Sequence, residues 1–595
     1  MTNGTKIENS VNLEQLLEFK VAFPNEDPLT PEKYLEGGNK SVILKVASHF
    51  LGFKPHDSKF NDNRELLGAI FGPENNNFAN DVNDRINAVE RTGKKISIIN
   101  VYTSLKLFEY FFDKEDDTKS QTEAEFERNI FKAYLLLNST FTKSQDVIEP
   151  STRELDAELK IPMMMFCLDY PVSDKVNFDI KQIWMTQVVK AIYLFQFLEL
   201  HEKTKPLLDA FLLYFQKSNW QDYLKCLLPL TLPAIQNEKE GHTDISVIPG
   251  KNFEEDCAFI EKLIIQNYDK LDESDFLTIR AKPFYKIENG VYRIIFNLFV
   301  VEKIFKGVYF LLRDVNNNLS NEHKFKEIKS FYGDEFSEKI LMYKVLDTIF
   351  PEKCIRYTGK ELSDRKIDGA PDYYIRKGKN VFLFESKDFL IKAEHKSSFD
   401  FNIYEREFQR ILYYQEMPDG SEKPKAVMQL INSVRRLLKK EFKADTYYFY
   451  KEVFIYPILL THDLQYDTLG FNKLLDYWFQ NELEGLKEEG LFIHHIKPLT
   501  VINIDSLIYH QGGLTENITI NEVIDAYHAY ILLKPWMKLK TETDYSAFLM
   551  SKFIPFAQFI NNYFNSKGIN KIPAILDMVS PALFSEKFEK EDEVS

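Results

Sequence analysis

The sequence predicts a multidomain protein with a mainly α-helical N-terminal region, an α/β domain whose mixed central sheet is flanked by helices, and a helical C-terminal extension. Three observations support this prediction. The chain has 595 residues, which is too long for one hydrophobic core. Apolar residues recur at three- and four-residue steps through most of positions 1–275. Between positions 331 and 512, short strand-like runs alternate with helical periodicity.

The first region, 1–275, is predicted to be helical. Residues 183–200 and 206–215 show its periodicity most clearly. Two polar stretches interrupt it: 113–117 indicates an acidic surface loop, and 236–250, which ends in Pro249-Gly250, indicates a linker or turn. We expect this region to act as a sensor, binding a partner protein or an activating ligand, or to recruit substrate.

A connector is predicted over 276–330. Two runs rich in strand formers, 276–285 and 291–299, flank Glu288-Asn289-Gly290, and an Asn-Gly pair in this position favours a β-hairpin. A helix is expected to follow over 301–313.

The α/β domain is predicted over 331–512, and the helical extension over 513–595 with an acidic tail at 586–593. Two strands are expected to form a hairpin through the tight turn 377–380. The predicted helices are 335–350, 403–415, 426–442 and 471–483, and the predicted strands are 372–376, 381–387, 453–461 and 499–504.

Composition and charge exclude several classes of protein. Hydrophobic residues make up 44% and charged residues 28%, which is typical of a folded globular chain. The N-terminus is polar, without the apolar core of a signal peptide, and the four scattered cysteines form no metal or disulfide pattern, so we expect a cytoplasmic protein that does not enter a membrane. The formal net charge of −15 argues against coating of nucleic acid, so any contact with DNA must be focal.

The hairpin carries the residues that point to chemistry. Asp372 follows Pro371 in the first strand, and Glu385 and Lys387 stand two apart in the second, so the latter two share a face while Ser386 points away. Antiparallel pairing can bring Asp372 beside Glu385. Phosphodiester hydrolysis needs carboxylates to hold a hard cation and a lysine to orient water and offset charge. A surface ion pair at a strand end is the alternative reading of this pattern.

Two flanking helices add context. Glu338 lies in line with an apolar stripe of the preceding helix and can serve as a further metal or water ligand, or simply stabilise the helix dipole; Glu335 is a competing candidate. Gln429 lies on the polar face of the helix predicted over 426–442. Residues 421–443 hold seven Lys or Arg and two Glu, a local net charge of 7 − 2 = +5. The residues expected to contact phosphates, or alternatively to form a solvated face, are Arg435, Arg436, Lys439 and Lys440.

Together these parts resemble the PD-(D/E)XK, or restriction-endonuclease-like, nuclease superfamily over about 330–510. The resemblance implies Mg²⁺, with Mn²⁺ as a substitute, bound by Asp372 and Glu385, and a Lys387 that acts on the water. Glu338 and Gln429 match auxiliary catalytic positions, and DNA is the usual substrate. We therefore expect a metal-dependent endodeoxyribonuclease, a hydrolase that acts in restriction or anti-phage defence. An RNA-directed nuclease with the same site and a non-catalytic scaffold are the alternatives.

Overall fold

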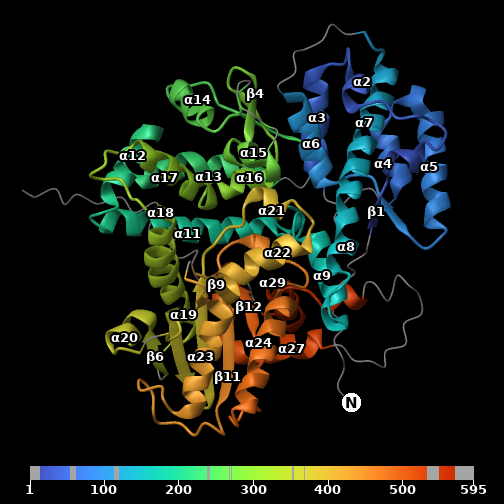
Figure 1. Ribbon diagram of the computed structural model, residues 1–595. Coiled ribbons are helices and arrows are strands. Elements are labelled where there is room, and N and C mark those ends of the chain that lie inside the picture. The colour runs from blue at the N-terminus through green and yellow to red at the C-terminus, as the bar shows by residue number, and fades with distance from the viewer. Residues whose placement is uncertain are drawn as a thin grey trace, which may run out of the picture.

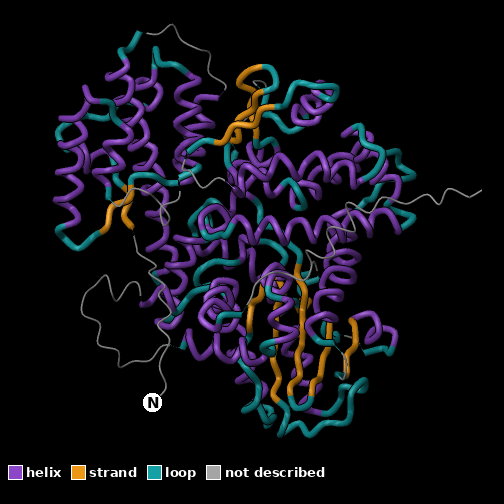
Figure 2. Tube along the Cα trace, turned by 180° about the vertical axis from the view of Figure 1, so that it is seen from behind, coloured by secondary structure: helices purple, strands orange, loops and turns teal. Residues whose placement is uncertain are grey.

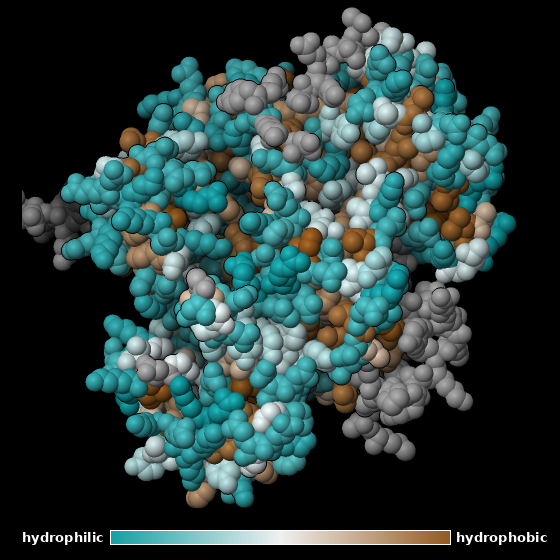
Figure 3. Space-filling view, viewed as in Figure 1, coloured by the Kyte–Doolittle hydropathy of each residue, from teal (hydrophilic) through white to brown (hydrophobic). Residues whose placement is uncertain are grey.

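The structure is a computed structural model that describes residues 14–53, 62–112, 120–236, 241–266, 269, 271, 273–351, 354–367, 369–417, 419–532 and 548–569. A sheet flanked by helices occupies one end of the molecule, helices make up most of the other end, and α11 (Ile180–Leu200) lies across the middle between them (Figure 1). Hydrophilic residues cover most of the face seen in Figure 3, and small hydrophobic patches interrupt them. No helix among the described residues is long and apolar enough to cross a membrane.

The region before the connector is built mainly from helices. The predicted segments 183–200 and 206–215 are α11 and α12 (Lys205–Phe215), and Asp179 caps α11 by accepting hydrogen bonds from the Lys181 and Gln182 amides. The acidic stretch 113–117 lies outside the described residues. The other helices of this region are α1 (Phe19–Ala22), α2 (Pro31–Leu35), α3 (Lys40–Leu51), α4 (Asn63–Ile70), α5 (Asn76–Glu90), α6 (Val101–Phe112), α7 (Glu123–Ser144), α8 (Ile148–Thr152), α9 (Ala157–Asp169), α10 (Ser173–Val176), α13 (Trp220–Gln236) and α14 (Phe253–Glu261).

Two small sheets accompany these helices. The strands β1 (Glu14–Leu16) and β2 (Lys95–Ser97) form a parallel pair. In the connector, β4 (Phe284–Glu288) and β5 (Val291–Ile294) form the antiparallel hairpin predicted around Gly290, whose φ of 76° is a left-handed turn conformation. The strand β3 (Thr243–Ser246) pairs with the other edge of β5, so this sheet joins sequence from both sides of position 275.

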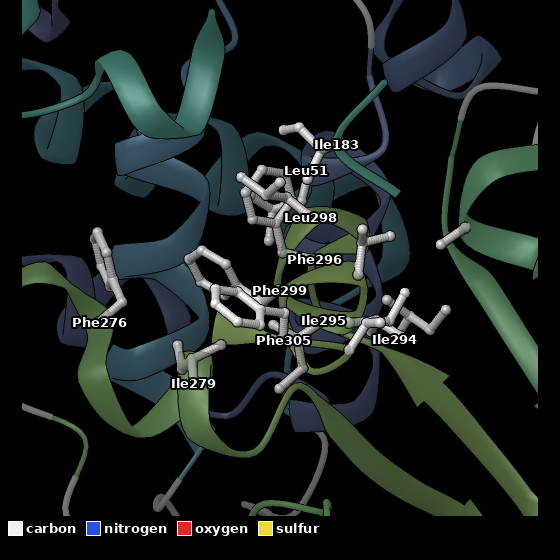
Figure 4. Close-up of a cluster of buried hydrophobic side chains, with 14 of the residues drawn as sticks. Leu51, Ile183, Phe276, Ile279, Ile294, Ile295, Phe296, Leu298, Phe299 and Phe305 are labelled. Atoms are coloured by element: carbon white, nitrogen blue, oxygen red, sulfur yellow. The ribbon is translucent and has the colours of Figure 1, made fainter. Parts of the chain in front are cut away.

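The structure corrects the outer ends of that predicted hairpin. Residues 277–281 form the short helix α15 (Leu277–Ala281), and 297–299 begin α16 (Asn297–Glu302), where strands were predicted. For α16 the cause is complete burial: Leu298, Phe299, Val300 and Val301 are all inaccessible to solvent, and such a continuous apolar run does not distinguish a strand from a buried helix. Figure 4 shows this cluster, in which Phe296, Leu298 and Phe299 gather near Ile183 of α11. The next helix, α17, spans Lys306–Asn318.

The central sheet has five strands in the order β12-β11-β8-β7-β6. Neighbours β6/β7 and β7/β8 are antiparallel, whereas β8/β11 and β11/β12 are parallel, so the sheet is mixed, as predicted. The strands are β6 (Ile355–Thr358), β7 (Tyr373–Lys377), β8 (Asn380–Lys387), β11 (Phe454–Thr461) and β12 (Thr500–Asn503).

Helices cover both faces of the sheet. The face with Phe382 and Phe384 packs against the π-helix η4 (Tyr332–Met342), α19 (Tyr343–Ile349) and the core of the N-terminal region. The opposite face, with Val381 and Leu383, packs against α23 (Ala426–Lys439) and α24 (Phe471–Glu488), which lie in front of the sheet in Figure 1. Because β8 is buried on both faces, it reads as a continuous apolar run. Figure 2 shows the sheet from behind.

The helix predicted over 403–415 was wrong at its C-terminal end. The helix predicted over 403–415 is α22 (Phe401–Phe408) continued by the π-helix η5 (Gln409–Tyr413), and the chain then forms β9 (Tyr414–Glu416). This strand pairs with β10 (Glu422–Pro424) through a turn that contains Gly420 with φ 79°. The pairing partner, rather than local propensity, converts 414–416 to a strand.

After the sheet the described chain is helical again, in α25 (Ile504–Tyr509), α26 (Gln511–Glu516), α27 (Ile520–Ile531) and α29 (Phe556–Lys567). The acidic tail predicted at 586–593 lies outside the described residues. The short α20 (Gly359–Asp364) follows β6, and α21 (Ala393–Lys396) follows β8.

Candidate active site

The β7–β8 hairpin brings Asp372 and Glu385 together. Tyr373 pairs with Phe384, so the preceding Asp372 lies opposite Glu385 across the strand pair. The Ser386 amide donates a hydrogen bond to Asp372 Oδ2 at 2.8 Å, which fixes the carboxylate against the end of β8. The chain also approaches closely here: the Gly359 amide donates to the Asp372 carbonyl at 2.7 Å, and a side chain at position 359 would lie within 3.2 Å of the Asp372 backbone.

Lys387 lies beside Glu385 on the same face of β8, as the strand alternation predicts. Its Nζ is 2.6 Å from Glu385 Oε1. The Glu385 side chain is fully buried, and that of Lys387 is 23% exposed. Ser386 points to the other face, where its Oγ lies 2.8 Å from His462 Nε2. Lys387 thus contacts the buried Glu385 carboxylate and is itself partly accessible to solvent.

Glu338 belongs to the same group, although it comes from the π-helix η4. The Tyr343 hydroxyl donates a hydrogen bond to Glu338 Oε1 at 3.3 Å. Burial and the nearby charge of Asp372 raise the pKa of Glu338 to about 7. The competing candidate Glu335 instead pairs with Lys339 at 2.6 Å. Of the two glutamates proposed from the sequence, the structure places Glu338 at the site.

Lys387 is too little positive charge to neutralise the three carboxyl groups of Asp372, Glu385 and Glu338. Burial, and then repulsion from Asp372, raises the pKa of Glu385 to about 8, although Lys387 opposes this shift. Burial also raises the pKa of Asp372. For Lys387, burial works to lower the pKa, but the charges of Glu385 and Asp372 outweigh it and raise the pKa. The group favours an additional cation on electrostatic grounds.

The oxygen donors fit a hard divalent cation. Glu385 Oε2 is buried and has no hydrogen-bond partner, so a ligand such as Mg²⁺ would satisfy it. Across the described ranges, no three His, Cys, Asp or Glu side chains are arranged to hold a metal ion. An ion held by Asp372 and Glu385 would therefore complete its coordination with water and phosphate oxygens, as Mg²⁺ commonly does.

Among the described residues, the Gln429 side chain forms no hydrogen bond with Asp372, Glu385 or Lys387. Gln429 lies in the first turn of α23. Its backbone N–H donates a hydrogen bond to the Lys425 carbonyl, and its backbone carbonyl accepts one from Ser433 Oγ. Lys425, which precedes the helix, interacts through its charge with Lys387. The N-terminal end of α23 therefore faces the candidate site, and Gln429 stays a predicted auxiliary residue.

The four basic residues predicted to bind nucleic acid lie toward the other end of α23. The helix has 14 residues and is about 20 Å long. Arg435 and Lys439 pair with Glu489 at 3.0 and 2.9 Å. Lys440 has φ 56° in the helix C-cap and lies over the Tyr450 ring. The role of these four residues in binding nucleic acid stays a prediction. Glu489 already offsets the charges of Arg435 and Lys439.

Sequence reasoning missed Arg410 of η5. Its charge and that of Lys423 of β10 act on Lys425, as does the charge of Lys387. Lys423 and Lys425 belong to the basic stretch 421–443, but no local pattern placed Arg410 or Lys387 beside them. His462 and Asp463 directly follow β11.

The chain matches none of the protein families, curated proteins or solved structures with which it was compared.

Proposed function

We propose that this protein is a Mg²⁺-dependent nuclease of the PD-(D/E)XK type that hydrolyses phosphodiester bonds of DNA. One observation carries the proposal. Asp372, Glu385 and Lys387 converge at the end of the β7–β8 hairpin, and one buried oxygen of Glu385 has no partner. A mixed sheet with helices on both faces, in which this hairpin precedes two parallel strands, supports the restriction-endonuclease-like interpretation.

In this proposal each side chain has a distinct role. Asp372 and Glu385 would hold the ion, which supplies a water of lowered pKa and polarises the phosphate. Lys387 Nζ, at the exposed edge of the group, orients the attacking water and offsets negative charge as it develops on the phosphate oxygens. Glu338, held by Tyr343, lies where it can accept a hydrogen bond from that water or from a second water molecule.

Basic side chains at the site support a nucleic-acid substrate. Burial, and then the charges of Lys423, Lys387 and Arg410, lower the pKa of Lys425, so these three basic side chains lie near it. This focal cluster is compatible with a chain of net charge −15, because neutralising a few phosphates is enough for binding. The choice of DNA over RNA comes from the family resemblance.

A role in restriction or anti-phage defence extends the proposal by analogy. Nuclease domains attached to large helical regions suit a protein whose helices sense a ligand or recruit a partner. The mainly helical region before the connector is the part of this chain that would serve that purpose.

Cleavage assays with site variants test the proposal. The full chain is incubated with plasmid, linear and single-stranded DNA and with RNA, in Mg²⁺, Mn²⁺ or EDTA. We expect metal-dependent cleavage of DNA, and a loss of about a thousandfold or more in Lys387→Ala and Asp372→Ala. Lys379→Ala, on the β7–β8 turn, is the matched control because that lysine is exposed and pairs only at the surface with Glu452.

A binding measurement supports the same test when no substrate is cut. Calorimetric titration of Mn²⁺ should show a site that Asp372→Ala removes and Lys379→Ala retains. Cleavage that persists in both Lys387→Ala and Asp372→Ala would show that the assigned group is not the active site. Metal binding without cleavage of any substrate would favour the non-catalytic alternative.

A further inference from the structure

A pocket lies where the parallel strands of the sheet end. Asp388 follows β8, His462 follows β11 and Asp505 follows β12, and all three line it. The opposite side is formed by α11, by α17 and by η4. The pocket is partly enclosed and opens to solvent. The carboxyl ends of parallel strands are the usual position of ligand sites in α/β sheets.

The pocket has one aromatic wall. Phe305, Tyr309, Phe310 and Tyr332 come from α17, the residue before it, and η4, and the Tyr309 and Tyr332 rings lie 4.8 Å apart between centroids. The Tyr309 and Tyr332 rings are inclined to each other at 54°, so a ligand ring can stack on one and meet the edge of the other. A ligand with a planar ring system fits this wall better than a compact ion does.

The floor of the pocket is polar, and some of its polar atoms have no hydrogen-bond partner. The Tyr332 hydroxyl and His462 Nδ1 are both buried without a hydrogen-bond partner, which is unfavourable unless a ligand satisfies them. Asp388, which accepts a hydrogen bond from Ser337 Oγ, interacts through its charge with both residues. These atoms present both donors and acceptors, as the edge of a heteroaromatic base requires.

The lysines of the pocket differ in what they contact. Lys190 pairs with Asp505 at 2.6 Å, and Lys306 pairs with Asp463 at 3.0 Å and Glu302 at 3.3 Å. Lys329 lies at the exposed mouth, where its charge interacts with that of Asp388. The two inner lysines are neutralised by carboxylates, so Lys329 is the cation best placed to meet an anionic group at the opening.

We propose that this pocket binds a nucleoside 5′-monophosphate, with the base against Tyr309 and Tyr332 and the phosphate at Lys329. The ring wall, the unpartnered polar atoms and the cation at the mouth match the three parts of such a ligand. The ligand is either a free nucleotide or one nucleotide unit of a nucleic-acid strand, since both present the same chemistry.

The pocket is separate from the candidate catalytic group but shares two chain segments with it. Lys387 and Asp388 are consecutive, as are Ser337 and Glu338, and in each pair one residue lines the pocket and the other belongs to the catalytic group. Ser386, which contacts the pocket residue His462, faces away from Glu385. We therefore expect ligand binding not to require the carboxylates of Asp372, Glu385 and Glu338, although an occupied pocket would restrain both chain segments.

Calorimetric titration tests this proposal without any need for nuclease activity. The four ribonucleoside 5′-monophosphates are titrated into the full chain in EDTA. We expect at least one to bind, and both Lys329→Ala and Tyr309→Ala to weaken that binding by about tenfold. Two controls should leave the affinity within about twofold: Lys326→Ala, an exposed lysine on the same segment, and Asp372→Ala, in the catalytic group. Thermal unfolding verifies that each variant folds.

A second titration identifies the source of the nucleotide. A 5′-phosphorylated single-stranded DNA oligonucleotide is added to Asp372→Ala protein with and without Lys329→Ala. Binding of free monophosphates supports a small-molecule ligand, whereas oligonucleotide binding alone, weakened by Lys329→Ala, supports a unit of the strand. The proposal is overturned if neither probe binds, or if both bind equally well after Lys329→Ala and Tyr309→Ala. Loss of nuclease activity in Asp372→Ala with nucleotide binding intact separates the two proposals.

Discussion

At the scale of single residues, Glu385 shows why the candidate site requires a cation. One of its oxygens contacts Lys387, and the other is buried without a partner. A single lysine faces three carboxyl groups, and the pKa values of Asp372, Glu385 and Glu338 are all raised. Such a cluster is unfavourable in the free protein, which is typical of positions arranged for a ligand rather than for stability.

Glu338→Gln should reduce cleavage by about 10–100-fold and raise the Mg²⁺ concentration needed for half-maximal activity. The amide keeps the shape and the Tyr343 contact but removes a charge beside Asp372, so the attraction for a cation falls. Cleavage rates measured across a Mg²⁺ series test this. Glu335→Gln is the matched control, because Glu335 pairs with Lys339 on the same helix. Equal Mg²⁺ dependence in the two variants would remove Glu338 from the site.

The residues that the sequence could predict are those whose position follows from strand alternation. Glu385 and Lys387 share a face and Ser386 points away, as expected. Glu338 could be proposed but not separated from Glu335, because η4 is a π-helix and its phase differs from that of an α-helix. Tyr343 and Arg410 could not be predicted, since their proximity depends on how helices pack on the sheet.

At the scale of elements, α23 carries basic residues at both ends in different surroundings. Near its start, Lys425 faces Lys387 and Arg410. Near its end, Arg435 and Lys439 contact Glu489. The sequence shows one basic segment, but packing against α24 leaves the two ends with different electrostatic potential.

Lys425→Ala should weaken DNA binding several-fold and lower the salt slope of log Kd by about one. Lys439→Ala should have a smaller effect, because Glu489 already neutralises that lysine. Fluorescence anisotropy with labelled DNA, in an Asp372→Ala background and over a salt series, measures both. A larger loss from Lys439→Ala would place the DNA path at the far end of α23 instead.

The strands of the sheet were predictable in proportion to their burial. β8 and β11 are long and buried on both faces, and their apolar runs identified them. β6 has only four residues, all half-buried at the sheet edge, and its sequence gave no signal. Its conformation depends on pairing with β7, which lies beyond a helix in the sequence. The strand β9 was missed for the same reason, since β10 supplies its partner.

The contact between β12 and α27 predicts a pH-dependent stability. His528 Nε2 lies 2.8 Å from Thr500 Oγ1, and burial lowers the pKa of His528 to about 4. The unfolded chain therefore binds a proton that the folded chain excludes. Stability should be unaffected above about pH 6.5 and should fall as the pH drops from there toward 4, by up to roughly 3 kcal/mol.

His528→Asn should flatten this dependence. Urea unfolding of both proteins at a series of pH values between about 7 and 4 gives the difference in the free energy of unfolding. His494→Asn is the control, because His494 is exposed. The same slope in wild type and His528→Asn would show that other groups dominate the acid sensitivity.

At the scale of the whole molecule, a buried ionic network joins the predicted regions. Asp174 contacts Lys175 at 3.0 Å, Arg280 at 2.7 Å and Lys396 at 2.8 Å. The network continues through Arg280 to Glu302, and from there through Lys306 to Asp463. Its members come from the helical region, the connector and the α/β region, so no stretch of sequence revealed it.

The network has equal numbers of acidic and basic residues, so the loss of one charge leaves an opposite charge uncompensated. It contains four acidic residues, Asp174, Asp275, Glu302 and Asp463, and four basic residues, Lys175, Arg280, Lys306 and Lys396. Burial works to raise the pKa of Asp174, but the charges of Lys175, Lys396 and Arg280 hold it well below its usual range. Asp174 therefore stabilises the fold above the pKa of an unfolded aspartate.

Asp174→Asn should destabilise the protein by about 3–5 kcal/mol, because it leaves the three buried cations Lys175, Arg280 and Lys396 sharing Asp275, with Glu302 in contact with Arg280 alone among them. The asparagine has nearly the same volume, so the loss is electrostatic and not due to a cavity. Thermal and urea unfolding of the full chain measure it, with Asp209→Asn, an exposed aspartate on α12, as the control. Because the ions are buried, the difference should persist in high salt, which screens only exposed charges. If the two variants are equally stable, the contact between the helical region and the α/β region depends on apolar packing alone.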